Sequence, residues 1–542
     1  MIEVKDTGIK SYHPDMDGDP LYVTKGNCHY SHEGTKDFLD YITAYQPEDG
    51  GVTFLVNTFR GAKAQVRIRF VSPTAFRFQM FPHLVQPKLN EVFGFAPVSG
   101  VQVTDESLFI VVKTERVTLR LRKCPWEMTV ELDGELLTME QIKDHNVDQK
   151  YKAVPVGFTV GDDGRILNAF ETMYMYCDEA FYGFGEKFTS FNKRGQKITV
   201  WQQDAQSTNS DVSYKGMPYF MSSEGYSVLM NTYTRTHFNM GASSGVSYTM
   251  ETEDPYLDYY MFCNRDYKGL IRDYTALSGR SAMIPRWAFG FWMSRMSYMS
   301  RQEVEEIVDQ MAKFGMSVDV IHIDGWLDTA QPDGGKELLC FDEKRFPDPE
   351  GMIQSLREKG IHLSLWMFPY VHAVDREGRF SNQFKIMNER GYLVKNQKGE
   401  PYLFSPGEGD AGNWKVAALD FTNPEFVAYM KERVKRLMRM GVGVIKTDFS
   451  EEIPEDAVMY DGSTGLESHN KYTLLYAKTI YEASREAKEE MGQKALLWGR
   501  LRGQPELPRE LGRRLFRCQE QSLRHSQRRP EHGRQRRFFL GL

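Results

Sequence analysis

The chain has 542 residues, 41% of them hydrophobic and 13% aromatic, so it is long enough for two or more domains with large cores. Its net charge of -6 and pI near 6.1 give no reason to expect nucleic acid as a partner. No basic segment precedes an apolar one at the N-terminus, and no apolar run has the length of a membrane span, so neither a signal peptide nor a membrane partner is expected.

The six cysteines show no regular spacing. They are Cys28, Cys124, Cys177, Cys263, Cys340 and Cys518. Neither a set of metal ligands nor a disulfide framework would be scattered in this way. We therefore expect reduced thiols and a cytoplasmic protein.

Residues up to about 280 have the pattern of β-strands. Segments such as "VTFLVNTFR", "AQVRIRFVS" and "WEMTVELDGELL" are rich in Val, Phe, Thr and Leu, and their apolar residues alternate with polar ones. Gly, Asp and Pro separate them. This pattern predicts an N-terminal antiparallel β-sandwich over residues 1–283.

From residue 284 onward, short apolar strands alternate with amphipathic helices. Strands are expected at 289–294, 318–326, 362–370, 441–449 and 495–500, and a helix is expected after Ser300 as its N-cap. Such units predict a parallel sheet, either open or closed. All five strands end in polar or aromatic groups. A barrel gathers all its strand ends at one mouth, which favours an α/β TIM barrel over residues 284–500.

Residues 501–542 have a different composition. They contain eleven Arg and four Glu but no Lys and no Asp. A basic tail is usually a solvated arm or a nucleic-acid contact. A change of reading frame is a third explanation, which the motifs below suggest.

The strand at 441–449 ends in the charged segment "VIKTDFSEEIP". Asp448 has three interpretations: a cap or ion-pair partner of Lys446, a metal ligand, or a nucleophile kept ionised by Lys446. No set of His or carboxylate residues with ligand spacing surrounds it, so no metal site is predicted.

Aromatic residues are frequent at the expected strand ends and loops. They are Trp292, Tyr298, Trp326, Trp366, Trp414 and Trp498. Aromatic faces with a few carboxylates suit a sugar, because the rings stack on CH-rich faces and the acids bind hydroxyls. Core packing is the alternative for each of them, and no Gly-rich loop suggests a phosphorylated sugar.

Several motifs resemble glycoside hydrolase family 31 when taken together in chain order. They are "YGFGEKF", "HIDGW", "FPDPEGMI", "LDFTNP", "KTDFSEEIP" and "LLWGR", and the fifth is similar to the α-xylosidase branch. The resemblance implies a (β/α)8 barrel behind a β-sandwich, further β-domains after the barrel, and retaining cleavage of terminal α-glycosides without a cofactor. It also allows a homo-oligomer in the full-length family.

Carried over by motif, the resemblance assigns Asp448 as the nucleophile. Asp324 would bind sugar hydroxyls in the innermost subsite, Lys446 would bind the sugar, and Trp366 would line the pocket. Arg500 would contact the sugar and the catalytic carboxylates.

Further residues have roles implied by the same resemblance. Tyr298 would place its ring against C5 of the sugar and leave little room for a hydroxymethyl group. Trp326 is a further candidate binding residue, although α-xylosidases continue with Cys-Phe after the equivalent of Asp324, where Gly325 stands here. Asp204 lies in "WQQDAQS", either a sandwich loop that reaches the site or an ordinary surface loop.

The expected activity is removal of terminal α-linked xylose from xyloglucan-type oligosaccharides through a glycosyl-Asp intermediate. A retaining glycosidase needs two carboxyl groups about 5–5.5 Å apart. An α-glucosidase of the same family and a non-catalytic carbohydrate-binding protein are the alternatives. We interpret Asp420 as a structural turn or cap before a helix near Pro424, and His469 as polar surface.

The general acid/base of the family is an Asp in a Trp-Gly-Gly-Asp stretch, which counted from Asp448 would fall near residue 514. No Asp occurs there. Permitted codons for residues 501–517, read one base later, can encode that stretch, with the Asp arising from the codon of Arg514. We therefore expect that the chain leaves its frame after Arg500, and that an incomplete barrel makes it inactive or insoluble.

Overall fold

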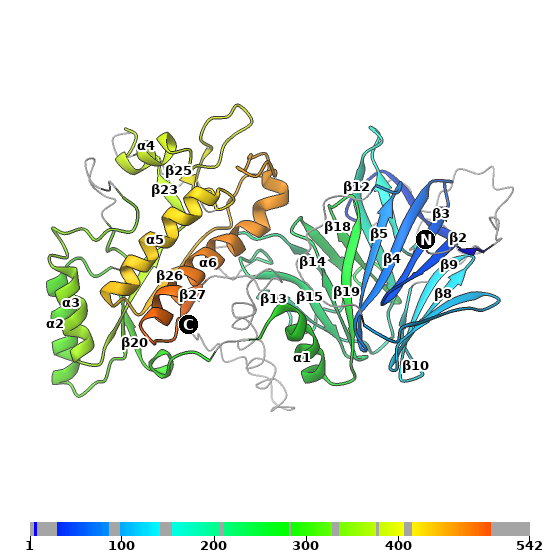
Figure 1. Cartoon of the computed structure of the whole chain (residues 1–542), viewed down its shortest axis with the longest axis horizontal. Helices are drawn as coiled ribbons and strands as arrows, with labels where there is room; N and C mark the ends of the chain where they lie inside the picture. The colour runs from blue at the N-terminus through cyan, green and yellow to red at the C-terminus, as the bar shows by residue number, and fades with distance from the viewer. Residues whose placement is uncertain are drawn as a thin grey trace.

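The computed structural model describes residues 5–7, 30–85, 98–140, 154–204, 210–280, 283–295, 297–327, 335, 337–374, 379–405 and 415–499. Figure 1 shows antiparallel sheets formed by the first half of the chain beside a half built from helices and short strands. The order confirms the predicted fold class, a β-sandwich followed by part of a TIM barrel. Site residue Arg500 and the Arg-rich residues 501–542 lie outside the described residues.

The sandwich contains one large antiparallel sheet. Its spatial order is β13 (Phe181–Gly185), β15 (Gly216–Ser222), β16 (Tyr226–Met230), β19 (Leu257–Cys263), β5 (Ala75–Pro82), β4 (Lys63–Ser72), β3 (Gly51–Thr58), β2 (Thr35–Glu48), β11 (Gly157–Val160), β12 (Ile166–Tyr174), β18 (Ser247–Thr252), β17 (Thr236–Asn239) and β14 (Lys197–Val200), with β1 (Lys5–Asp6) paired to β2. Strands β13 and β14 therefore end the order, and Figure 1 shows both on the side of the sandwich that is nearer to the barrel half.

A second antiparallel sheet covers the large one. Its order is β10 (Glu135–Met139), β9 (Trp126–Leu132), β8 (Val117–Lys123), β7 (Phe109–Lys113) and β6 (Gln102–Asp105). Alternate residues of β8, namely Val117, Leu119 and Leu121, are buried against alternate residues of the large sheet such as Phe54 and Val56. This two-residue period is the alternation that predicted the sandwich.

Five parallel strands form the barrel half. Their order is β20 (Trp292–Ser294), β21 (Val320–Ile323), β22 (His362–Met367), β26 (Val444–Thr447) and β27 (Leu497–Gly499). Each lies inside one of the five predicted segments. Helix α1 (Tyr267–Ser278) and the short helix η3 (Arg286–Phe289) lie between the last sandwich strand and β20.

Amphipathic helices accompany the parallel strands. They are α2 (Arg301–Lys313), α3 (Pro349–Glu358), α4 (Asn382–Glu389), α5 (Pro424–Met440) and α6 (Gly465–Glu490). The Ser300 hydroxyl accepts a hydrogen bond from Glu303 N, which confirms the predicted cap of α2. No helix in the described part of the chain is long and apolar enough to cross a membrane.

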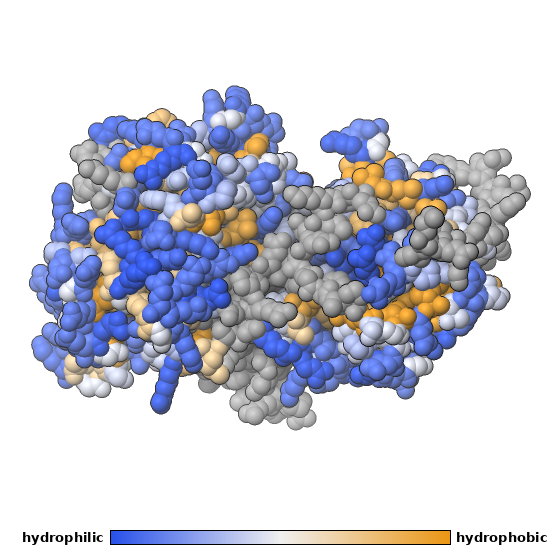
Figure 2. Space-filling view, in the orientation of Figure 1, coloured by the Kyte–Doolittle hydropathy of each residue, from blue (hydrophilic) through white to orange (hydrophobic). Residues whose placement is uncertain are grey.

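A ladder of ion pairs joins α5 and α6, which run in the same direction (Figure 1). The three pairs recur every four residues on both helices and are Lys431–Glu482 at 2.7 Å, Lys435–Glu486 at 2.7 Å and Arg439–Glu490 at 3.0 Å. These charges lie on the outer faces, and Figure 2 shows a mainly hydrophilic surface over this half. The opposite faces, with Met430, Val434 and Leu437 of α5, enter the core.

A small antiparallel sheet between β22 and β26 was not predicted. It consists of β23 (Tyr370–His372), β25 (Val416–Ala418) and β24 (Leu403–Phe404), in that order. Asp420, just after β25, accepts hydrogen bonds from Thr422 N at 2.9 Å and Tyr460 N at 2.7 Å. Asn423 caps α5. The structural interpretation of Asp420 is therefore confirmed.

Candidate active site

The carboxyl ends of the parallel strands bring several predicted site residues together. In the strand register, Trp366 of β22 lies opposite Lys446 of β26, and Lys446 lies opposite Trp498 of β27. Residues opposite one another in a sheet project from the same face. Asp324 and Asp448 follow directly after β21 and β26, at this same end of the sheet.

Asp448 is held by groups from two strands. Its Oδ2 accepts a hydrogen bond of 2.9 Å from Trp366 Nε1 and lies 3.1 Å from Lys446 Nζ. Its Oδ1 accepts from Phe449 N at 3.2 Å. The ammonium group and the indole N–H both favour a negatively charged carboxylate at this position.

Lys446 also connects the two carboxylates of the site. Its Nζ lies 3.8 Å from Asp324 Oδ1, so the ammonium group is placed between Asp324 and Asp448. His322 Nε2 lies 2.9 Å from the same Asp324 oxygen, and His322 Nδ1 lies 2.8 Å from Ser364 Oγ. Because a carboxylate only accepts, His322 Nε2 carries a proton and fixes the orientation of Asp324.

The backbone turns sharply immediately after Asp448. Phe449 and Ser450 have φ angles of +57° and +104°, which non-glycine residues rarely adopt. The carbonyl of Met367 accepts from Asp448 N at 2.9 Å and from the Tyr476 hydroxyl at 3.1 Å. Burial and the charge of Asp448 raise the pKa of Tyr476 well above its usual value, so Tyr476 is a neutral donor behind the carboxylate.

Two predicted aromatic site residues are buried in the barrel core. Trp326 is 1% exposed, donates its indole N–H to Trp366 O at 2.7 Å and packs on Phe341. Tyr298 is fully buried, with the Arg295 guanidinium 5.3 Å from its ring, and burial raises its pKa. Neither ring is exposed to solvent. Trp326 is connected to the site only through its hydrogen bond to Trp366 among the bonds of the described residues. The roles of Trp326 and Tyr298 in sugar binding stay predictions.

The sandwich contributes Asp204 to the surroundings of the site. Asp204 is 2% exposed, and its backbone N–H donates to Glu452 Oε1 at 3.3 Å. Glu452 follows Asp448 by only four residues. Residues 201–204 are therefore packed on the barrel, unlike an ordinary surface loop.

Some residues near the site were missed by sequence reasoning. His322 was not singled out, although its two-residue spacing from Asp324 in a strand was a signal that both lie on one face. The interpretation of His469 as polar surface was wrong, because His469 is 5% exposed and its ring stacks on Trp201. Trp498, expected only near the strand ends, has its ring 5.2 Å from Lys446 Nζ.

The chemistry available here is that of an anchored carboxylate. Within the part of the chain that is described, no group of three or more His, Cys, Asp or Glu could hold a metal ion. Asp448 can act as a nucleophile, and Asp324, Lys446 and the Trp366 ring can bind hydroxyls and an apolar ring face.

Comparison with known proteins gives two matching family models. The TIM-barrel domain of glycosyl hydrolases family 31 matches residues 281–503, and the N-terminal galactose mutarotase-like domain of glycosyl hydrolase 31 matches residues 65–239. The two matches follow the order of the observed barrel and sandwich.

Curated relatives match over much of the chain. An α-xylosidase, XylQ, of Lactiplantibacillus pentosus is 32% identical over 397 residues, which cover 72% of this chain and 48% of the relative. An α-xylosidase of Emericella nidulans is 32% identical over 311 residues, which cover 56% of this chain and 37% of the relative. The chain thus spans about half or less of the length of these relatives.

The fold also matches solved structures. The cycloalternan-forming enzyme from Listeria monocytogenes superposes with a TM-score of 0.75 at 22% identity, over 88% of this chain and 45% of that structure. At this identity the likeness concerns the fold alone. The two family models and the curated relatives show that the chain belongs to glycoside hydrolase family 31.

Proposed function

We propose that this chain carries the nucleophile of a retaining α-glycoside hydrolase that removes terminal α-linked xylose from oligosaccharides. The observation that supports it most directly is the Asp448 carboxylate, held by Trp366 and Lys446 at the end of β26. Asp324, on the other side of Lys446, would bind the hydroxyls of the sugar. The two α-xylosidase relatives favour xylose.

In the proposed reaction, an Asp448 oxygen attacks the anomeric carbon while the bond to the leaving oxygen breaks. The leaving oxygen takes a proton from a carboxylic acid, and water later releases the sugar from Asp448. Trp366 and Lys446 would hold the attacking carboxylate in place. No cofactor is needed for these steps.

We further propose that the 542-residue chain does not complete this cycle. The proton donor expected by resemblance would fall near residue 514, where the sequence has Arg514 instead of Asp. Sequencing the coding DNA tests the proposed change of frame, since the shifted frame must encode Trp-Gly-Gly-Asp. Turnover of an aryl α-xyloside by this chain at ordinary glycosidase rates would contradict the proposal.

A mechanism-based label tests the nucleophile separately from turnover. A 5-fluoro xylosyl fluoride carries a fluoride leaving group, which departs without a proton donor, so it should attach to Asp448 even in this chain. We expect peptide mapping to locate the label on Asp448, to lose it in Asp448→Asn, and to retain it in the control Asp420→Asn. A label on Asp324 or Asp420 would refute the assignment.

A non-catalytic sugar-binding protein is separated from an enzyme by the same variant. Asp448→Asn should retain oligosaccharide binding in both cases, measured by calorimetry. Only an enzyme would lose its covalent label.

An α-glucosidase is the second candidate, and the burial of Tyr298 favours it. A ring with no exposed surface would not by itself exclude a hydroxymethyl group from the sugar site. Parallel labelling with the xylosyl and glucosyl reagents decides between the two, because each is expected to label only the matching enzyme efficiently.

We also propose a cytoplasmic location. The six cysteines of the sequence lack the regular spacing of a disulfide framework, as expected for a protein of a reducing compartment. Cell fractionation with an antibody against the sandwich would test this.

A further inference from the structure

A short segment of the sandwich, residues 201–204, lies on the barrel segment 451–455 that follows Asp448. Gln202 N donates to Asn470 Oδ1 at 3.0 Å, while the Gln202 side-chain amide bonds to both backbone groups of Gly216. Asp204 N donates to Glu452 Oε1 at 3.3 Å. The segment is thus anchored in the sandwich by its side chain and on the barrel by its backbone.

His469 of α6 joins the two segments. Its Nδ1 lies 2.7 Å from Ile453 O and its Nε2 lies 2.7 Å from Gln202 O. A carbonyl oxygen can only accept a hydrogen bond. Both bonds therefore exist together only when both ring nitrogens carry a proton, that is, when His469 is an imidazolium.

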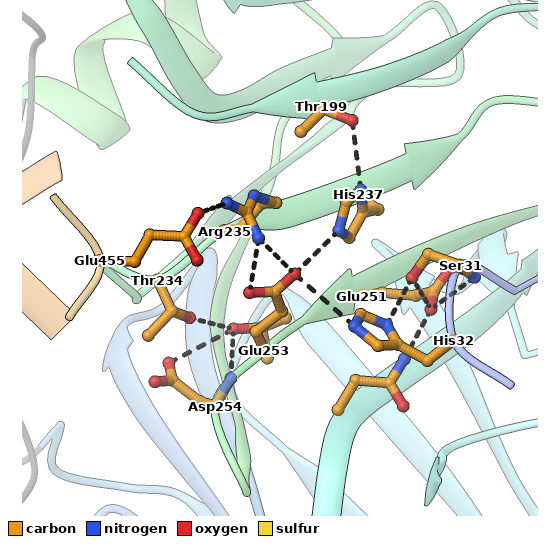
Figure 3. Close-up of polar contacts among 12 residues, drawn as sticks. Ser31, His32, Thr199, Thr234, Arg235, His237, Glu251, Glu253, Asp254 and Glu455 are labelled. Carbon is orange, nitrogen blue, oxygen red and sulfur yellow. Dashed lines mark hydrogen bonds and ion pairs between the residues drawn. The ribbon is translucent and has the colours of Figure 1, made fainter. Parts of the chain in front are cut away.

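Trp201 fixes the plane of this imidazole. The two rings are stacked with centroids 3.7 Å apart and planes 8° apart, and the Arg235 guanidinium lies 4.3 Å from the Trp201 ring. Two groups this close cannot share one face of an indole, so Trp201 lies between them. Figure 3 shows Arg235 held in turn by Glu253, the residue directly after β18, at 3.1 Å, and by Glu455 of the barrel segment.

The charge of His469 depends on opposing effects. Burial lowers its pKa, the carbonyl bonds to Gln202 and Ile453 act in the opposite direction, and of the charged groups that face it Glu455 raises the pKa and Arg235 lowers it. The balance leaves the pKa below the ordinary value of 6.5. The second proton is therefore present in acid and is lost as the pH rises, which leaves a ring nitrogen lone pair facing a carbonyl oxygen.

We propose that His469 is a positioning residue for the site around Asp448: its protonated form ties residues 201–204 to residues 451–455, and its deprotonation loosens this contact. Ile453 and Glu452 are separated from Asp448 only by Phe449, Ser450 and Glu451, of which the first two have positive φ angles. A change in the contact therefore acts on the segment that begins with Phe449, whose backbone N–H donates to Asp448 Oδ1 at 3.2 Å. This inference rests on the proposed function only in naming Asp448 as the reacting group.

Amide hydrogen exchange of the whole chain tests the contact without any need for activity. After correction for intrinsic rates, peptides that cover 201–204 and 451–455 should exchange about tenfold more slowly at the acid end of a pH series, run down from pH 8 as far as the chain stays folded, than at pH 8; this is the change expected for about one charge-assisted hydrogen bond. His469→Gln, which does not titrate, should abolish this difference. The matched control is His362→Gln, because His362 also stacks on a tryptophan, Trp287, at 4.2 Å, but lies at the start of β22.

Equal protection of these peptides across the whole pH series in the unmodified chain would overturn the proposal. Loss of the pH-dependent difference in His362→Gln would overturn it as well. If His469→Gln does not fold, ¹⁵N-histidine NMR of the unmodified chain decides, since both His469 nitrogens must be protonated in acid. If the 5-fluoro xylosyl label attaches to Asp448, its rate of attachment should fall over the pH range in which the exchange protection is lost. This fall should occur in the unmodified chain but not in His469→Gln. Absence of the label would refute the proposed function while leaving the exchange result intact.

Discussion

The indole of Trp366 donates a hydrogen bond of 2.9 Å to the carboxylate of Asp448 across the β22–β26 strand pair. Trp366→Phe keeps an aromatic ring and removes this donor. A hydrogen bond to a charged group contributes about 1.5–3 kcal/mol. We therefore expect covalent labelling of Asp448 to become about ten- to a hundredfold slower, as followed by mass spectrometry.

Trp326→Phe is the control for that prediction, because its indole donates to Trp366 O and not to a carboxylate. Trp326→Phe should lower the melting temperature, and its labelling rate should fall much less than that of Trp366→Phe. Equal rate losses in both variants would show that packing, and not the bond to Asp448, controls the rate.

Asp420 is predicted to stabilise the fold without taking part in the reaction. Its buried carboxylate accepts from Thr422 and from Tyr460 N, so Asp420→Ala leaves buried donors unsatisfied. The expected cost is about 1–3 kcal/mol, measured by urea unfolding. Asp309→Ala removes only a surface pair with Lys359 and should cost clearly less than Asp420→Ala.

The ion pair between Arg439 and Glu490 closes the ladder between α5 and α6. Both side chains are about half exposed, so Arg439→Glu should reduce stability by about 1 kcal/mol at most. Adding Glu490→Arg should restore most of the loss. Both effects should shrink at about 1 M salt in thermal melts, and a loss insensitive to salt would contradict the electrostatic origin.

Two buried carboxyl groups in the sandwich, Glu140 and Glu171, predict a dependence of stability on pH. Burial raises the pKa of Glu140 to about 8, and burial together with the charge of Glu140 raises the pKa of Glu171 well above 4.5. The folded state therefore binds more protons than the unfolded state between about pH 4.5 and 8, so stability falls as the pH rises.

Glu171→Gln removes one of these titrating groups and should flatten that slope in urea unfolding at several pH values. Glu131→Gln, in a partly exposed pair with Arg120, is the control and should keep the slope. The same slope in Glu171→Gln as in the unmodified chain would show that this pair does not govern the pH dependence.

Much of the fold could be predicted because strand burial is visible in the sequence. The five parallel strands are short and mostly apolar, and each falls inside a segment chosen for that reason. The sheet of β23, β25 and β24 was missed because its strands of two or three residues are antiparallel and stand outside the strand–helix alternation that identified the equally short β20 and β27.

The site was predictable in part for a related reason. Asp324, Lys446 and Asp448 stand at strand ends, and parallel strand ends converge. The burial of Tyr298 and the environment of His469 could not be predicted in this way. His469 contacts Gln202, 267 positions away in the chain, so its burial depends on how the sandwich meets α6 and not on its local pattern.

The stack of Trp201 on His469 also constrains how this architecture can be shuffled between relatives. A chimera with its crossover in the connection between β19 and β20 would inherit the tryptophan from one parent and the histidine from the other. The matched pair would then survive only if both parents happened to share it. Crossovers before Trp201 or after His469 keep the pair from a single parent, and recombinants built that way should retain a correctly seated Asp448 more often.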